Sequence, residues 1–149
     1  MKRKESKKLL WQKKLLMDEY ILTTSEQALK NIQNSYKLTK ELVDLYLQSN
    51  CKSICIVASG SSSNGSTAAK DFMRRYLGVS VEIMPPFTFT HYNHDLVENS
   101  FTVVVSQSGI STNCIDALKK LRELGKTAIG ITANVKNDFK DYADIEIDY

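Results

Sequence analysis

The sequence predicts an α/β fold, a three-layer αβα sandwich built around a five-stranded parallel sheet. Short apolar segments rich in β-branched residues alternate along the chain with longer segments of helical periodicity. This alternation is typical of a parallel sheet with helices on both faces. The valines at 103–105 are consecutive, as expected of a parallel strand that is buried on both sides. The right-handed crossover rule then favours the flavodoxin-like strand order 2-1-3-4-5.

The first predicted helix precedes the first strand. Thr24 or Ser25 can act as its N-cap, with Gln27 as the partner in a capping box. Apolar residues recur at helical spacing until Asn50, and their one-sided face predicts packing over a core. These residues are Leu29, Ile32, Tyr36, Val43 and Leu47. The short apolar segment 53–58 is the first predicted strand.

A serine-rich stretch at 59–67 is predicted to be a polar loop, and the helix after it ends at Gly78. The predicted inward face of this helix consists of Ala68, Ala69, Phe72, Met73, Tyr76 and Leu77. The second strand spans 79–84, since two prolines then prevent its continuation. The segment 87–95 fits either a short helix or a loop.

The third strand leads into a second polar loop at 106–112 and a helix at 112–124. A fourth strand is predicted at 127–132, and one helical turn at 137–142. The last segment, 144–149, alternates isoleucine with acidic residues, which favours an edge strand.

Composition argues against a membrane or secreted protein. Hydrophobic residues make up 42% of the chain and charged residues 25%, as in ordinary globular domains. No apolar run approaches the roughly 18 residues that span a bilayer, and no signal peptide is evident. We therefore expect a cytoplasmic protein with reduced cysteines. His91 and His94 lack a third ligand nearby, so no metal or other cofactor is expected.

Positive charge is concentrated at the amino terminus. Residues 1–16 carry seven basic side chains against Glu5, a net charge of +6, so the total of +3 leaves −3 for residues 17–149. The acidic remainder has no basic stripe, and a nucleic-acid partner is not expected. We predict a basic tail at 1–23, partly disordered or helical, and a single domain at 24–149.

The two polar loops, 59–64 and 106–112, follow the first and third predicted strands. These strands are neighbours in the order 2-1-3-4-5, so the loops meet at the switch point where such sheets bind ligands. Helix amino termini offer unpaired N–H groups, and serine hydroxyls add donors for an anion such as phosphate. Neither loop has a nucleotide-binding pattern or a serine-hydrolase elbow, which favours a single phosphate monoester. In the alternative interpretation, the serines only cap helices and form turns.

A family resemblance supports the ligand-binding interpretation. The stretch 106–111 (SQSGIS) resembles the Ser-Gln-Ser-Gly-x-Thr/Ser loop of SIS (sugar isomerase) domains, and 60–64 (GSSSN) is similar to their Gly-Thr-Ser-x-Asn loop. The pairs at 124–125 and 143–144 resemble the family's helix end and its turn before the last strand. The resemblance covers about 24–149 and is closest to the amino-terminal SIS half of glucosamine-6-phosphate synthase-like phosphosugar isomerases and deglycases.

The resemblance implies a phosphorylated sugar as the ligand, a hexose or hexosamine 6-phosphate. It implies six residues around the phosphate: Ser62, Ser106, Gln107, Ser108, Ser111 and Thr112. It also implies that Gly60 and Ser61 contact the sugar.

The resemblance does not assign catalytic residues. The family's Glu-x-x-Val-x-Ser/Thr-Lys segment and second SIS domain do not occur within residues 1–149. We therefore expect the binding part of a phosphosugar isomerase or deglycase of amino-sugar or carbohydrate metabolism, acting as a homodimer. His91, Asp95 and Glu98 lie near the site in sequence but match no catalytic position of the family. Alternatively, the chain is a regulatory domain that senses a sugar phosphate without catalysis.

Overall fold

The computed structural model describes residues 2–133 and 136–148. The chain divides into two units, Met1–Lys40 and Glu41–Tyr149. The first unit consists of α1 (Lys2–Gln33) and the start of α2 (Ser35–Ser49).

The predicted N-cap at Thr24 or Ser25 is wrong, because both residues lie inside α1. The Thr24 hydroxyl donates a hydrogen bond to the carbonyl oxygen of Tyr20, 2.6 Å away, one turn back in the same helix. A threonine hydroxyl bonded in this way is compatible with a helix interior. The preceding lysines, leucines and glutamates are good helix formers, so the helix begins well before the predicted cap.

The second unit contains a five-stranded parallel sheet in the order β2-β1-β3-β4-β5, which confirms the predicted topology. The strands are β1 (Ser53–Ala58), β2 (Ser80–Met84), β3 (Phe101–Val105), β4 (Ile129–Thr132) and β5 (Ile145–Asp148). β1 and β3 pair in a register that sets Ala58 opposite Val105. The two strands therefore end level with each other, and the chain segments after them start side by side.

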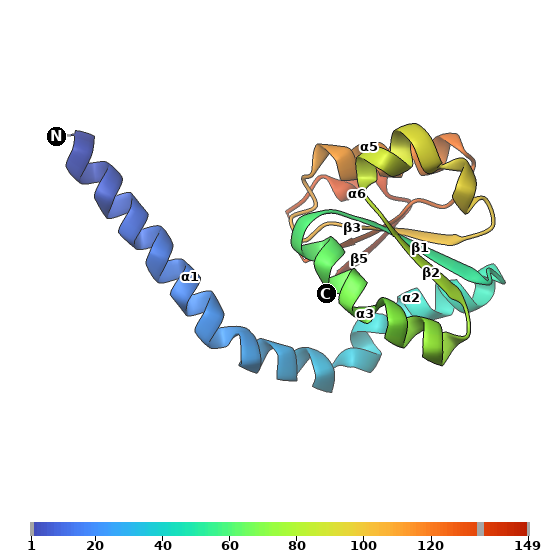
Figure 1. Ribbon diagram of the computed structural model, residues 1–149, viewed down its shortest axis with the longest axis horizontal. Helices are drawn as coiled ribbons and strands as arrows, with labels where there is room; N and C mark the ends of the chain where they lie inside the picture. The colour runs from blue at the N-terminus through green and yellow to red at the C-terminus, as the bar shows by residue number, and fades with distance from the viewer. Residues whose placement is uncertain (1, 134–135, 149) are drawn as a thin grey trace. The chain divides into compact units, whose positions relative to one another are not determined.

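Helices cover both faces of this sheet, which confirms the three-layer sandwich (Figure 1). On one face lie α4 (Pro86–Thr88), α5 (Thr112–Glu123) and α6 (Phe139–Tyr142). On the other face lie α3 (Gly60–Leu77) and the 41–49 part of α2. The two serine-rich segments thus lead into helices on opposite faces of the sheet.

The face under α5 is tightly packed. Leu118 and Leu121 of α5, together with Phe89 and Phe139, are completely buried in one cluster with residues of β1 and β3. Cys55 of β1 belongs to the same cluster, and its burial raises the pKa of the thiol to about 12, with a smaller contribution from the charge of Glu82. This face forms the larger part of the core.

The face under α2 and α3 is more open, and here the predicted inward residues are largely wrong. Of the six apolar residues assigned to the inner side of α3, Met73 packs against the core, whereas Phe72 and Tyr76 are 64% and 70% exposed. The α2 residues that contact the sheet are Leu42, Leu45 and Tyr46. The others predicted to face inward are exposed: Leu29, Ile32, Tyr36, Val43, Leu47 and Leu77. Helical periodicity identifies an apolar stripe, but it does not say which layer covers that stripe.

The connection from β2 to β3, which the sequence left open, consists of short helical turns. After α4 the chain forms one π-helical turn, η1 (Phe89–Asn93), and one 3₁₀ turn, η2 (Asp95–Val97). Phe89 and Val97 are buried and fix this connection to the core. In the part of the chain that the structure describes, no helix combines the length and apolarity needed to cross a membrane.

Candidate functional site

The candidate site lies at the carboxyl ends of β1 and β3. α3 begins two residues after β1, and the loop 106–111 joins β3 to α5. The amino termini of both helices therefore flank the same edge of the sheet, one above and one below it. Their first-turn N–H groups have no partners within the helices, and the dipole of each helix is positive at this end. The arrangement offers two sets of donors to one anion.

The β1–α3 junction differs from its predicted form. The stretch 59–67 is not a loop, because α3 starts at Gly60 and runs through the serines. Ser59 is the extended residue before the helix, and the Ser66 hydroxyl donates to the Ser62 carbonyl oxygen at 2.8 Å. Such bonds to the preceding turn let a serine-rich segment remain helical. The donors available here are therefore those of a helix start.

The predicted ligand residues of this junction lie in the first turn of α3. Gly60 and Ser61 are exposed, and Ser62 is half-buried. Gly60 has a φ of +57°, which favours glycine at the point where the chain turns into the helix. These three residues are thus accessible at the edge where β1 ends.

The β3–α5 loop keeps its predicted form. It holds four of the other five predicted residues, and the fifth, Thr112, is the first residue of α5. Ser106 is buried, Ser111 is half-buried, and Gln107, Ser108 and Thr112 are exposed. Gly109 lies in the middle of the loop with a φ of +64°, and its N–H donates to the Ser106 carbonyl oxygen at 3.1 Å. The loop is therefore a tight turn that exposes two polar side chains beside the start of α5.

The Ser106 and Ser111 side chains also interact with Cys114 at the start of α5. Burial raises the pKa of the Cys114 thiol, and hydrogen bonds with the Ser111 and Ser106 hydroxyls act in the opposite direction. Cys114 lies in the first turn of α5 and is 1% exposed. The two hydroxyls therefore contribute to holding the loop against the helix start, in addition to any contact with a ligand.

Two residues that sequence reasoning missed support this loop. Thr132, at the end of β4, is fully buried, and its hydroxyl donates to the Gln107 carbonyl oxygen at 3.2 Å. Asn137 is 3% exposed and lies against Gly109. The sequence carries only a weak signal for them. Both are hydrogen-bonding residues at or just after the end of the fourth strand, and that end lies beside the carboxyl end of the third.

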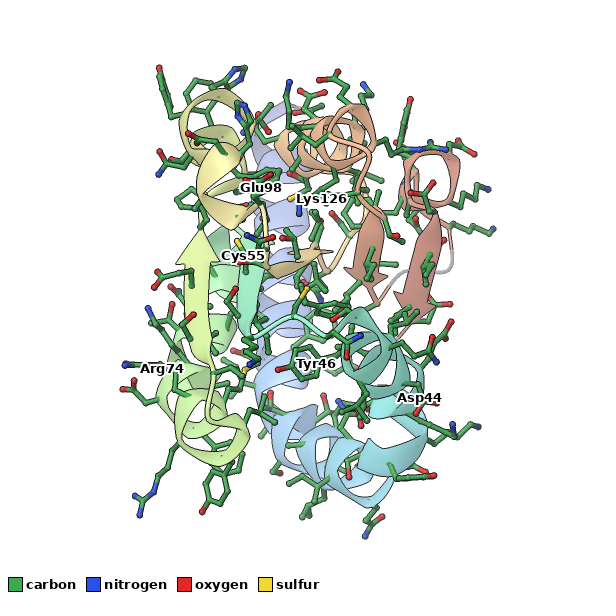
Figure 2. The ribbon with its side chains drawn as sticks, turned by 90° about the vertical axis from the view of Figure 1, so that its right-hand side faces the viewer. Asp44, Tyr46, Cys55, Arg74, Glu98 and Lys126 are labelled. Atoms are coloured by element: carbon green, nitrogen blue, oxygen red, sulfur yellow. The ribbon has the colours of Figure 1, made fainter. Side chains whose placement is uncertain are left out.

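The three possible acid–base residues, His91, Asp95 and Glu98, do not all lie at the same end of the strands. Glu98 lies at the amino ends of the strands, opposite the loops. There Lys126, just before β4, donates a hydrogen bond to the Glu98 carbonyl oxygen (Figure 2). Nearby, the Ser53 hydroxyl at the start of β1 lies 2.7 Å from the Ser100 hydroxyl. Glu98 is therefore remote from the serine loop despite its closeness in sequence.

His91 lies on η1 in the segment that follows the carboxyl end of β2, with its ring 4.4 Å from that of Phe87. Asp95 is exposed at the start of η2. Among the residues described, no group of three or more metal-binding side chains occurs.

Comparison with known proteins places the chain in a family. The model of the SIS domain matches residues 47–149. The chain belongs to the SIS domain family, as its serine loops suggested.

Relatives and solved structures agree with this assignment. The chain is 29% identical over 124 residues to glutamine–fructose-6-phosphate aminotransferase (isomerizing) of Caldanaerobacter subterraneus subsp. tengcongensis, covering 83% of this chain and 19% of that protein. The chain thus spans about one fifth of the length of that relative.

Two solved structures illustrate the fold. A Clostridium difficile 630 protein assigned as a phosphosugar isomerase is 25% identical with a TM-score of 0.68, covering 86% of this chain and 36% of the other. A Listeria monocytogenes protein assigned as a sugar-phosphate isomerase has a TM-score of 0.63 at 18% identity, covering 89% of this chain and 71% of the other. At that identity the second likeness concerns the fold alone.

Proposed function

We propose that this SIS domain binds a phosphorylated sugar, with a hexose or hexosamine 6-phosphate as the preferred class. In this proposal the phosphate lies between the starts of α3 and α5. It accepts hydrogen bonds from the loop residues 106–108 and from Ser62, Ser111 and Thr112, while Gly60 and Ser61 contact the sugar.

One observation carries the proposal: two helix starts rich in hydroxyls meet at the carboxyl ends of neighbouring strands, in register at Ala58 and Val105. No lysine or arginine occurs within 59–67 or 106–112. Neutral donors and helix dipoles suit one phosphate group, whereas nucleotide loops add a lysine for the further phosphates. Each hydrogen bond to the charged group contributes roughly 1.5–3 kcal/mol.

The proposal extends to the setting of the domain. We infer a role in a phosphosugar isomerase or deglycase of amino-sugar or carbohydrate metabolism, in the cytoplasm. A homodimer is favoured by the exposed apolar residues of α2 and α3, among them Leu47 and Phe72. Leu47 also borders an apolar cavity of about 470 Å³ between these helices and the sheet. Size-exclusion chromatography with light scattering would detect the dimer, and a monomer at micromolar concentration would contradict it.

Thermal unfolding with added ligand tests the binding proposal. At 100 times its dissociation constant, a ligand stabilises the folded state by about 2.7 kcal/mol. For a chain of this size that raises the Tm by roughly 2–4 °C per kcal/mol. We expect such a rise with fructose 6-phosphate or glucosamine 6-phosphate, measured by calorimetry. Unphosphorylated glucosamine is the control, because it lacks the group that the two helix starts would bind.

The matched variants are Ser62→Ala and Ser66→Ala. Ser62 lies in the first turn of α3, whereas Ser66 lies one turn further along and donates to the Ser62 carbonyl. We expect Ser62→Ala to reduce the stabilisation by the ligand and Ser66→Ala to leave it nearly unchanged. A folded wild-type protein whose Tm rises with none of the hexose or hexosamine 6-phosphates would overturn the proposed function.

A further inference from the structure

We propose that Thr132 and Asn137 are positioning residues that hold the 106–111 loop in the conformation that binds an anion. The two residues and the neighbouring backbone of 133 and 138 are called the clamp below. This inference rests on the proposed function, since it assigns a role to residues that support the proposed phosphate loop.

The clamp bonds the loop at two of its carbonyl groups. The Gln107 carbonyl oxygen accepts from the Thr132 hydroxyl at 3.2 Å and from the Ala133 N–H at 3.1 Å. The Gly109 carbonyl oxygen accepts from the Asp138 N–H at 3.2 Å. Three hydrogen bonds from one segment therefore fix two alternate peptide groups of the loop.

Fixing these carbonyls also fixes the directions of two N–H groups. In a trans peptide group the C=O and the N–H point in opposite directions. With the Gln107 and Gly109 carbonyls bonded to the clamp, the N–H groups of Ser108 and Ile110 point away from it. The Ser108 hydroxyl lies on that side too, since it accepts from the Ile110 N–H at 3.5 Å. Because this bond is long, an anion on that side would replace it at the Ile110 N–H. Neighbouring N–H groups directed to one side form a concave site for an anion.

Asn137 is itself held in place by both ends of its side chain. Its Oδ1 accepts from the Phe139 N–H at 2.7 Å, and its Nδ2 donates to Glu146 Oε1 at 2.5 Å. These bonds connect the clamp to α6 and to β5. The position of the loop is thereby tied to the outer part of the sheet.

The loop approaches the clamp so closely that only glycine fits at its centre. A Cβ built on Gly109 would lie 2.5 Å from Asn137 Cβ and 3.0 Å from Thr132 Oγ1. Thr132 is completely buried and Asn137 is 3% exposed, so neither side chain can move aside into solvent. This close contact is the geometric reason to assign the clamp a positioning role.

Thr132→Val tests the inference, because valine keeps the shape of threonine but cannot donate to Gln107. Thr132→Ser restores the hydroxyl. The control is Thr102→Val, since Thr102 is also a buried strand threonine, and its hydroxyl bonds to the Ser100 carbonyl at the opposite end of β3. Two quantities are measured on the full chain: amide hydrogen exchange at Gly109 and Ala133 without ligand, and the Kd for glucosamine 6-phosphate by calorimetry.

We expect Thr132→Val to speed exchange of the Gly109 and Ala133 N–H groups, which are hydrogen-bonded to the loop carbonyls of Ser106 and Gln107. We also expect it to raise the Kd roughly five- to tenfold, the effect of about one lost hydrogen bond. Thr132→Ser should restore both values to within about twofold of wild type, and Thr102→Val should leave both unchanged. Unchanged exchange and Kd in folded Thr132→Val, or equal effects of Thr102→Val, would overturn the inference.

A second variant, Asn137→Asp, keeps the acceptor for the Phe139 N–H but loses the donor to Glu146. It should likewise speed loop exchange, and it decides the question if Thr132→Val fails to fold: exchange as slow as wild type in this variant would overturn the inference. If the wild type binds no sugar phosphate, the proposed function fails, whereas the exchange measurement still tests the clamp independently.

Discussion

The two halves of the candidate site contain similar residues but are supported very differently by the fold. The 106–111 loop is bonded to the clamp, and its Gly109 is packed against buried side chains. The β1–α3 junction is exposed, and a Cβ built on Gly60 would meet nothing within 4 Å. Ser59 makes no side-chain hydrogen bond to cap α3. One half is thus held in place by buried contacts, whereas the other is open. In the proposed complex, the first would be preformed for the phosphate and the second would adjust to the sugar.

Substitution of the two glycines would produce the largest contrast between the halves. In the left-handed region an alanine costs roughly 1–2 kcal/mol at either position. At Gly109 the close contacts with Asn137 add an overpacking cost of roughly 1–3 kcal/mol. We therefore expect Gly109→Ala to lower the free energy of unfolding by roughly 2–5 kcal/mol and to abolish sugar-phosphate binding. Gly60→Ala should lower the free energy of unfolding by only roughly 1–2 kcal/mol. Urea unfolding and calorimetry measure both effects.

The claimed difference between the loop and the β1–α3 junction would be wrong if Gly60→Ala lowered the free energy of unfolding as much as Gly109→Ala. Equal losses would mean that the β1–α3 junction is held as rigidly as the loop, contrary to the open space around Gly60.

Serine substitutions in the two halves would sharpen the contrast for binding. Ser108→Ala should raise the Kd for glucosamine 6-phosphate at least tenfold, because a hydrogen bond to the charged phosphate is worth roughly 1.5–3 kcal/mol and about 1.4 kcal/mol is tenfold. Ser62→Ala should have a smaller effect, since a less rigid donor loses part of its gain to ordering on binding. Titration calorimetry of both variants measures the difference. A larger effect of Ser62→Ala would mean that the β1–α3 junction, and not the 106–111 loop, is the more rigid half.

Chemical labelling of Cys114 would give the smallest but most local effect. Thiol reagents attack the thiolate, and burial raises the pKa of this thiol above its ordinary value of 9.0. We expect labelling to be slow near neutral pH and to accelerate as the pH rises through the raised pKa, because the thiolate fraction grows in that direction. Loosening the clamp with Thr132→Val should accelerate labelling at constant pH. Peptide mass spectrometry measures the labelling rate at Cys114.

The control for the labelling experiment is again Thr102→Val, which should leave the rate at Cys114 unchanged. An equal acceleration in both variants would indicate general destabilisation, and the local interpretation would then be wrong.

Local patterns were sufficient to predict the sheet. Apolar, β-branched segments predicted all five strands, and their alternation with helices predicted the order β2-β1-β3-β4-β5. The 106–111 loop was predicted as a loop because its glycine and serines follow a buried strand directly. These features depend on residues close in sequence, where propensity and periodicity act.

The errors arose where competing local structures were nearly equal in energy or where a distant partner decided the outcome. The serines at 59–67 favour turns and helix starts alike, and the structure makes them the first turns of α3. The apolar stripes on α2 and α3 were recognised, but their periodicity could not say which residues would contact the sheet.

By itself, the sequence determined the class of fold and the position of the serine loop after β3, and from its neutral donors it predicted a single phosphate group as the ligand. Only the tertiary structure decided that Glu98 lies at the end of the strands opposite the serine loop, and that Thr132 and Asn137 support the loop. The reason is physical. Strand and loop preferences come from each residue and its neighbours, whereas a contact between residue 109 and residue 137 exists only after β4 has paired beside β3.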